Sequence, residues 1–123
     1  MQDETAGPLY YASLAGLEQV SKHLLEKMDM NAQGGKYGTA LQAASCGGHE
    51  VIVKLLLEKG ADVNVQAEEY GTALQVASLW GHEVIVKLLL EKGAEVNVQA
   101  GQHGTALQVA SFWGHEVIVM LLL

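Results

Sequence analysis

The sequence contains no arginine. All seven of its basic residues are lysines, against fourteen acidic residues, so the formal net charge is −7. Proteins that bind nucleic acid use arginine and lysine to neutralise phosphates and arginine to read bases, and anionic membranes attract basic segments. The composition therefore argues against nucleic acid and against a membrane surface as partners.

Cysteine and long apolar runs are also scarce. Cys46 is the single cysteine, so the chain cannot form an internal disulfide. The longest apolar run, 117–123, is far shorter than the roughly 20 residues that a membrane-spanning helix needs. Residues 1–4 (MQDE) are acidic and lack the apolar segment of a secretory signal. We therefore expect a soluble intracellular protein located in the cytoplasm.

A period of 33 residues dominates the chain. The segment 37–66 (YGTALQAASCGGHEVIVKLLLEKGADVNVQ) recurs with four changes at 70–99, and its first part recurs at 103–123. A period of this length indicates stacked repeats, which bury their apolar faces against one another. We expect one domain, 1–123, with repeats at approximately 5–36, 37–69, 70–102 and 103–123, the last of them truncated.

Each repeat predicts two short helices. Thr39 and Gln42 have the spacing of a capping box, which places the start of a helix near residue 40. Gly48 suits the left-handed position just beyond a helix end. We therefore expect one helix over about 40–47 and a second over about 50–58, and the same pattern in the following repeats.

These repeats, which can be written as rows at a period of 33 residues, resemble the ankyrin repeat. The family signature T-P-L-H-x-A corresponds to 39–44 (TALQAA), its Gly-His turn to 48–49, and its GADVN segment to 60–64. The resemblance implies an all-α solenoid of stacked helix–turn–helix units with short β-hairpin or loop connections. It further implies a module that binds another protein. The near-identical rows are similar in style to arrays in fungal NACHT–ankyrin proteins.

The rows depart from the family pattern at three places. Ala40 replaces the family proline, and Gln42 replaces the family histidine. Tyr37 occupies the usual position of the turn glycine, and Gly38 follows one place later. Because the corresponding residues of the next two rows do the same, we expect a shifted turn in each connection.

The two ends of the array differ in polarity. Gln19, Ser21 and His23 stand where the internal rows have apolar residues, which predicts a polar outer face on the first repeat. Residues 116–123 keep the internal apolar pattern and stop within the expected second helix. We expect either that the array continues in a longer protein or that this uncapped repeat associates with a partner, such as a second copy of the chain.

Histidine and cysteine do not form a recognisable catalytic or metal-binding pattern. His49, His82 and His115 share one repeat position, and stacked helices lie about 8–10 Å apart, too far for neighbours to share a zinc ion at about 2 Å. We expect these histidines to hydrogen-bond to the backbone between repeats. Cys46 lies three residues from His49, but Gly48 is expected to break the helix between them, and no orienting acid is evident. We predict no catalytic residue, no cofactor and no metal.

The near-identical rows diverge at the end of the first helix and at the tip of the connection. In the ankyrin repeat family, which these rows resemble, both places line a concave binding surface. Tryptophan is enriched among the residues that dominate the energetics of protein interfaces. We predict that a partner protein contacts the following residues of these places: Leu79, Trp80, Phe112, Trp113, Cys46, Tyr70, Glu68 and Glu69.

Other interpretations of the same residues stay open. The indoles of Trp80 and Trp113 can serve packing by stacking on each other, and Tyr70 can pack against the next repeat. Glu68 and Glu69 are either simply solvated or select a basic segment of the partner. As a whole, the array can also be a structural spacer or a self-association module in which near-identical rows stack end to end.

Overall fold

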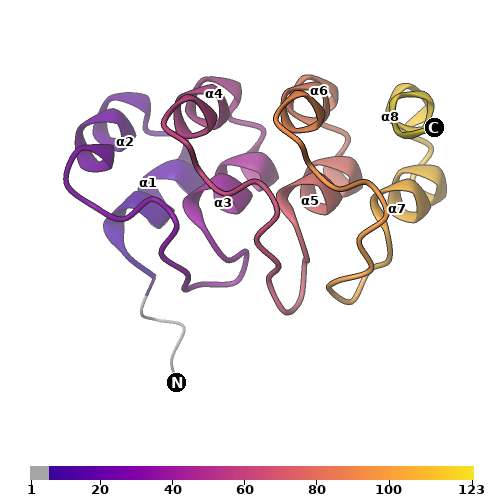
Figure 1. The fold of residues 1–123 in the computed structure, drawn as a ribbon, viewed down its shortest axis with the longest axis horizontal. Coiled ribbons are helices and arrows are strands. Elements are labelled where there is room, and N and C mark those ends of the chain that lie inside the picture. Colours follow the sequence, from indigo (N-terminus) through magenta and orange to yellow (C-terminus); the bar gives the residue numbers. More distant parts are fainter. Residues whose placement is uncertain (1–5) are drawn as a thin grey trace.

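The computed structural model describes residues 6–123 as four helix pairs stacked in a row (Figure 1). The inner helices are α1 (Pro8–Ala15), α3 (Ala40–Gly47), α5 (Ala73–Trp80) and α7 (Ala106–Phe112). The outer helices are α2 (Glu18–Leu25), α4 (Glu50–Glu58), α6 (Glu83–Glu91) and α8 (Glu116–Leu122). This architecture confirms the all-α solenoid, and α3 and α4 have the predicted bounds. The acidic segment 1–4 and the expected start of the first repeat at residue 5 lie outside the described residues.

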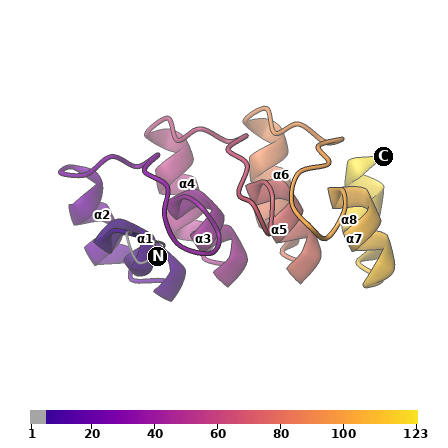
Figure 2. The same cartoon turned by 90° about the horizontal axis from the view of Figure 1, so that it is seen from below.

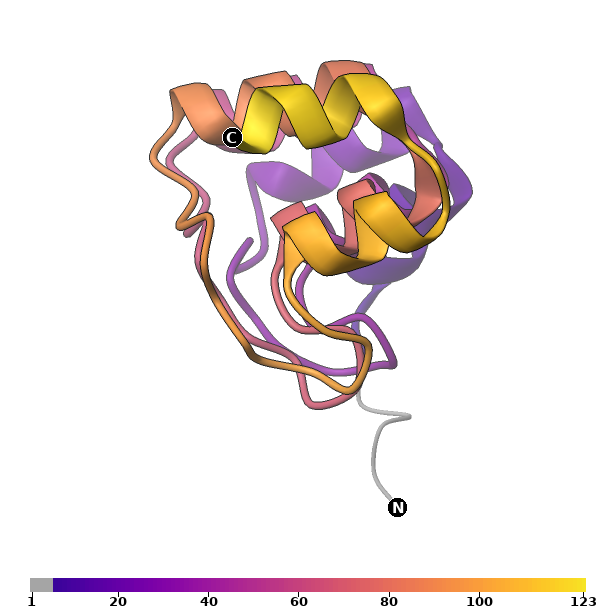
Figure 3. The same ribbon diagram turned by 90° about the vertical axis from the view of Figure 1, so that its right-hand side faces the viewer.

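The helices form two layers, with inner helices packed on inner helices and outer on outer. Figure 3 shows the array end-on: α8 lies above α7, and the loops that enter the inner helices extend below them. Seen from below, in Figure 2, the loops run along the upper part of the array and across the inner helices, whose C-terminal ends point to the lower edge of the view. The rows diverge at both places, the loop tips and the ends of the inner helices.

Threonine and glutamine start the inner helices as the sequence predicts. In α5, the Thr72 hydroxyl accepts a hydrogen bond from the Gln75 backbone N–H at 3.2 Å, and the Gln75 Oε1 accepts one from the Thr72 N–H at 2.8 Å. This reciprocal pairing is a capping box, and α3 and α7 begin in the same way. Gly48 follows α3 with a left-handed φ of 74°, which confirms the predicted helix end.

The amide of each capping glutamine also holds the next loop. The Gln75 Nε2 donates to the carbonyl oxygens of Ala100 at 2.7 Å and Gly104 at 3.0 Å. The Gln42 Nε2 donates in the same way to the carbonyl of Gly71 at 2.6 Å. One side chain therefore caps its own helix and fixes the connection of the following repeat.

The connections themselves are loops with very little strand structure. Within residues 6–123 the strand pairing is one isolated antiparallel bridge between Ala67 and Gly71, whose backbone N–H and carbonyl groups pair at 2.9 and 3.0 Å. The glycine of this bridge is the one that the sequence places one position later than usual.

The core lies between the layers and between successive repeats. Leu74 and Ile85 are fully buried. Leu107 has the same repeat position as Leu74 but is only half-buried, because no further repeat packs against α7 within residues 6–123. Burial therefore depends on neighbouring repeats, as expected of a solenoid.

The predicted polar face on the first repeat is wrong for Ser21. Its side chain is fully buried, and its hydroxyl has no hydrogen-bond partner among the described residues. Gln19 and His23 are exposed. The outer face of this repeat instead exposes Tyr11 and Val20, at 51% and 47%. The repeat position of Ser21 faces the core, because Val53 at the same place is also fully buried.

The three repeat-position histidines bind backbone, as predicted. The Nε2 atoms of His82 and His115 donate hydrogen bonds to the carbonyl oxygens of Cys46 and Leu79, both at 3.1 Å. His49 makes the equivalent bond to Leu14 at 2.9 Å. Each bond joins an outer-helix start to the end of the inner helix one repeat earlier. The Nε2 atom of His49 is therefore occupied by a hydrogen bond to the backbone of the preceding repeat.

Candidate protein-binding surface

The aromatic rim, defined as Leu79, Trp80, Phe112 and Trp113, lies at the C-terminal ends of α5 and α7. Trp80 and Trp113 are 52% and 59% exposed, and Phe112 is 80% exposed. The Phe112 and Trp113 rings meet edge to face with centroids 5.1 Å apart. The Trp80 ring pairs with no other aromatic ring within residues 6–123. The two indoles thus do not stack on each other, and each tryptophan is about half exposed to solvent.

Cys46 sits at the rim position of the preceding repeat but is half-buried. Its thiol contacts Tyr37, and this contact, followed by burial, raises the pKa of the Tyr37 phenol above its ordinary value. Tyr37 is therefore neutral at physiological pH. Its backbone N–H donates to the Tyr10 hydroxyl at 2.9 Å, and burial raises the pKa of Tyr10 as well.

Tyr70 belongs to a stack of rings that joins the three loops between successive helix pairs. Its ring centroid lies 4.8 Å from that of Tyr37 and 5.0 Å from that of His103. The Lys36 ammonium lies 5.7 Å from the centre of the Tyr70 ring, at cation–π distance. This geometry favours the packing interpretation of Tyr70, and contact with a partner stays a prediction.

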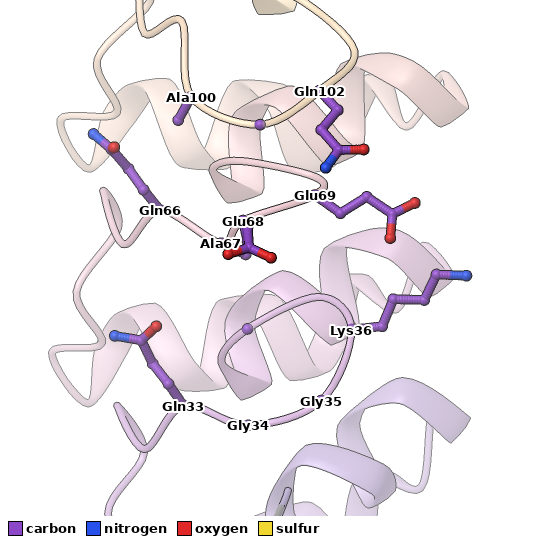
Figure 4. A pocket seen from close by; sticks show the side chains of 12 residues that line it. Gln33, Gly34, Gly35, Lys36, Gln66, Ala67, Glu68, Glu69, Ala100 and Gln102 are labelled. Carbon is purple, nitrogen blue, oxygen red and sulfur yellow. The ribbon is translucent and has the colours of Figure 1, made fainter. Parts of the chain in front are cut away.

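A groove of about 760 Å³ runs across the three loops; we call it the loop groove (Figure 4). Its lining is polar and rich in glycine. The residues that line it are Gln33, Gly34, Gly35, Lys36, Gly38, Gln66, Ala67, Glu68, Glu69, Ala100, Gly101 and Gln102. The structure thus brings Glu68 and Glu69, two predicted binding residues, into one groove with residues that were not predicted.

The loop groove is held together by contacts between its loops. The Gln102 N–H donates to the Glu69 carbonyl oxygen at 2.7 Å. The Glu69 carboxylate lies 4.0 Å from the His103 Nε2, and both side chains are about 40% exposed, at 41% and 43%. These contacts fix neighbouring loops relative to one another, so the groove is preformed.

Comparison with known proteins identifies the repeats. A family profile described as ankyrin repeats, in three copies, matches residues 9–100 and 66–123. The chain belongs to the ankyrin repeat family. Ankyrin repeats are generally modules of protein–protein interaction, and the family is typically non-enzymatic.

Two curated proteins share ankyrin-type sequence with this chain. One is the azaphilone pigments biosynthesis cluster protein L of Monascus ruber, which is 48% identical over 48% of this chain. The other is alpha-latrotoxin-Lh1a of Latrodectus hasselti, which is 40% identical over 45% of this chain. The matched segments cover only 14% and 4% of those proteins, so the likeness concerns the ankyrin repeats alone.

The described residues were found to contain neither a metal-binding cluster nor a membrane-spanning helix. Within the part of the chain that the structure describes, no three histidine, cysteine or acidic side chains come together at metal-binding distance. Over the same residues, no helix combines the length and apolar character needed to cross a membrane. The aromatic rim and the loop groove are exposed features of the described residues.

Proposed function

We propose that this array binds a partner protein through the aromatic rim and the loop groove, without catalysing a reaction, in the cytoplasm. The observation that carries the proposal is the exposure of Trp80 and Trp113 at a position where otherwise near-identical rows differ. Indoles with half their surface in water gain free energy when a partner covers them. The core does not require them, because Gly47 occupies the same repeat position.

Rigidity favours this function. The capping glutamines, the histidine bonds between repeats and the stacked rings of Tyr37, Tyr70 and His103 fix the inner helices and loops before any partner arrives. A preformed surface loses little conformational entropy on binding, so more of the contact energy appears as affinity.

The double variant Trp80→Ala/Trp113→Ala is expected to reduce recovery of a specific partner at least tenfold, because tryptophans in an interface often contribute more than other side chains. The measurement is a quantitative pull-down from the source cell extract, followed by titration of the recovered partner. Circular dichroism first establishes that the variant keeps its helicity.

The matched control is Val51→Ala/Val84→Ala, which removes two exposed apolar side chains from outer helices (54% and 42% exposed). This control is expected to bind as the wild type does. If the wild type and the tryptophan variant recover the same amount of partner, both indoles serve packing only, and the proposal is contradicted.

A second candidate function is self-association through the open face of the last repeat. Leu107 and Val119 are half-buried there, whereas their counterparts Leu74 and Val86 are fully buried by the next repeat. This face therefore exposes apolar surface that a second copy of the chain covers in the self-association model.

If the face self-associates, the wild type forms dimers whose fraction rises with concentration, because apolar burial drives association. Leu107→Gln/Val119→Gln is then monomeric in sedimentation velocity. Met120→Lys, which removes an exposed apolar side chain at the solvent-facing position of Lys54 and Lys87, still dimerises. A wild type that is monomeric at every concentration tested excludes this second function.

A further inference from the structure

The loop groove contains the carboxylate of Glu68, and the loop on either side has no side chain at the same repeat position. Glu68 occupies the loop position at which the two neighbouring loops have Gly35 and Gly101, and all three residues line the groove. The loops themselves require both glycines. They have φ values of 82° and 79°, and a Cβ would lie 2.6 Å from the Tyr10 ring at Gly35 and 2.7 Å from the Gly71 nitrogen at Gly101. Those places are already filled by the Tyr10 ring and by the backbone of the preceding loop, so neither neighbouring loop can carry a side chain at the position of Glu68.

The second carboxylate of the loop groove, that of Glu69, has polar side chains at its own position in the neighbouring loops, and Glu68 has none. Glu69 has Lys36 and Gln102 at the same position of the neighbouring loops, and its carboxylate lies 4.0 Å from the His103 ring. Figure 4 shows Lys36, Glu69 and Gln102 along one edge of the groove, with Glu68 between the loops. Glu68 is exposed and forms no ion pair with any group in residues 6–123.

The net charge of the whole chain also favours a cationic partner. A net charge of −7 attracts cationic segments over a distance comparable to the Debye length. Within residues 6–123, Lys36 is the one cation that lines the groove, and its ammonium lies 5.7 Å from the Tyr70 ring centre, at the edge rather than beside Glu68.

We propose that the loop groove binds an extended polypeptide segment of the partner and that a lysine or arginine of this segment pairs with Glu68. The inference rests on the proposed binding function and specifies the chemistry of the partner. The segment passes over Gly35 and Gly101, where no side chain obstructs it, and its cation meets the carboxylate between them. The aromatic rim then contributes apolar contacts, and Glu68 selects for charge.

A phage-displayed library of random peptides, selected against the intact chain, tests the inference. The wild type is expected to enrich peptides with lysine or arginine at one position. Selection against Glu68→Gln is expected to enrich no cation there. The best peptide, measured by fluorescence anisotropy, is expected to bind Glu68→Gln about fivefold more weakly, as for the loss of one solvent-exposed ion pair.

Two controls separate this pairing from a general effect of charge. Glu91→Gln makes the same change of charge on the exposed surface of α6 and is expected to leave peptide affinity unchanged. Replacing the peptide's cation with methionine is expected to weaken binding to the wild type fivefold and binding to Glu68→Gln hardly at all, which is the sign of direct coupling.

The outcomes distinguish this inference from the function on which it rests. Enriched peptides that depend on Trp80 and Trp113 but carry no cation, or carry an acidic residue, overturn the role of Glu68 and leave the binding function standing. An equal cation preference in Glu68→Gln also overturns it. A selection that enriches no peptide against the wild type counts against both.

Discussion

Replacing Gln75 with alanine is expected to lower the free energy of unfolding by about 3 kcal/mol. The substitution removes the acceptor that pairs with the Thr72 N–H at 2.8 Å, which weakens the start of α5. It also removes the donor shared by the carbonyls of Val98, Ala100 and Gly104, at 3.3, 2.7 and 3.0 Å. These contacts are only partly buried, so water replaces part of the lost bonding, and the total loss stays below the sum of about 1–3 kcal/mol for each fully buried unpaired carbonyl. Urea unfolding followed by circular dichroism measures the loss.

The last repeat provides a matched control for this substitution. Gln108 makes the same capping box, with Oε1 2.8 Å from the Thr105 N–H, but its side chain is exposed and holds no second loop within residues 6–123. Gln108→Ala is expected to lose only about 1 kcal/mol, the value of a helix cap. Amide exchange over 98–104 should accelerate in Gln75→Ala alone. Equal losses in the two variants would mean that the amide does not hold the following loop.

Local patterns predicted the helices well because their signals lie within a few residues. The spacing of Thr39 and Gln42 placed the start of α3, and Gly48 placed its end. The backbone role of the histidines was also predictable, because three copies at one repeat position, too far apart to share an ion, point to a structural task. In each case the deciding information is local or strictly periodic.

Contacts between repeats were harder to predict. The bond from Gln75 to Gly104 joins residues that are 29 positions apart, and only the assembled stack brings them together. A signal did exist, because glutamine keeps this position in all three rows that carry the capping box. The error at Ser21 has a different origin: its polarity suggested exposure, whereas α2 keeps the inward-facing positions of α4, where Val53 is also fully buried.

The candidate site was partly visible in the sequence. Divergence among copied rows pointed to Trp80, Trp113 and Glu68, and the structure exposes all three. The loop groove was not predictable, because its open space depends on how three loops align side by side. Once they are aligned, Glu68 lies between Gly35 and Gly101, two positions of the groove lining that carry no side chain.

The largest packing effect is expected for Leu74→Ala, which should lower the free energy of unfolding by about 3–4 kcal/mol. Leu74 is fully buried in the core between α5 and its neighbours, so alanine removes apolar contacts and leaves a cavity that tightly packed helices fill only in part. In a solenoid the loss falls on the interface with the next repeat as well as on the repeat itself. Equilibrium unfolding in urea, with an unchanged m-value, would report this loss directly.

Leu107→Ala tests whether the neighbouring repeat is the cause. Leu107 has the same repeat position and the same surrounding motif as Leu74, but it is half-buried because no further repeat covers α7 within residues 6–123. It is expected to lose only about 1 kcal/mol, since less apolar surface leaves water when the chain folds. The difference between the two variants then measures what one further repeat adds to the stability of this array. If both variants lose the same amount, each repeat is stabilised from within, and the stacked interfaces contribute far less than the burial of Leu74 indicates.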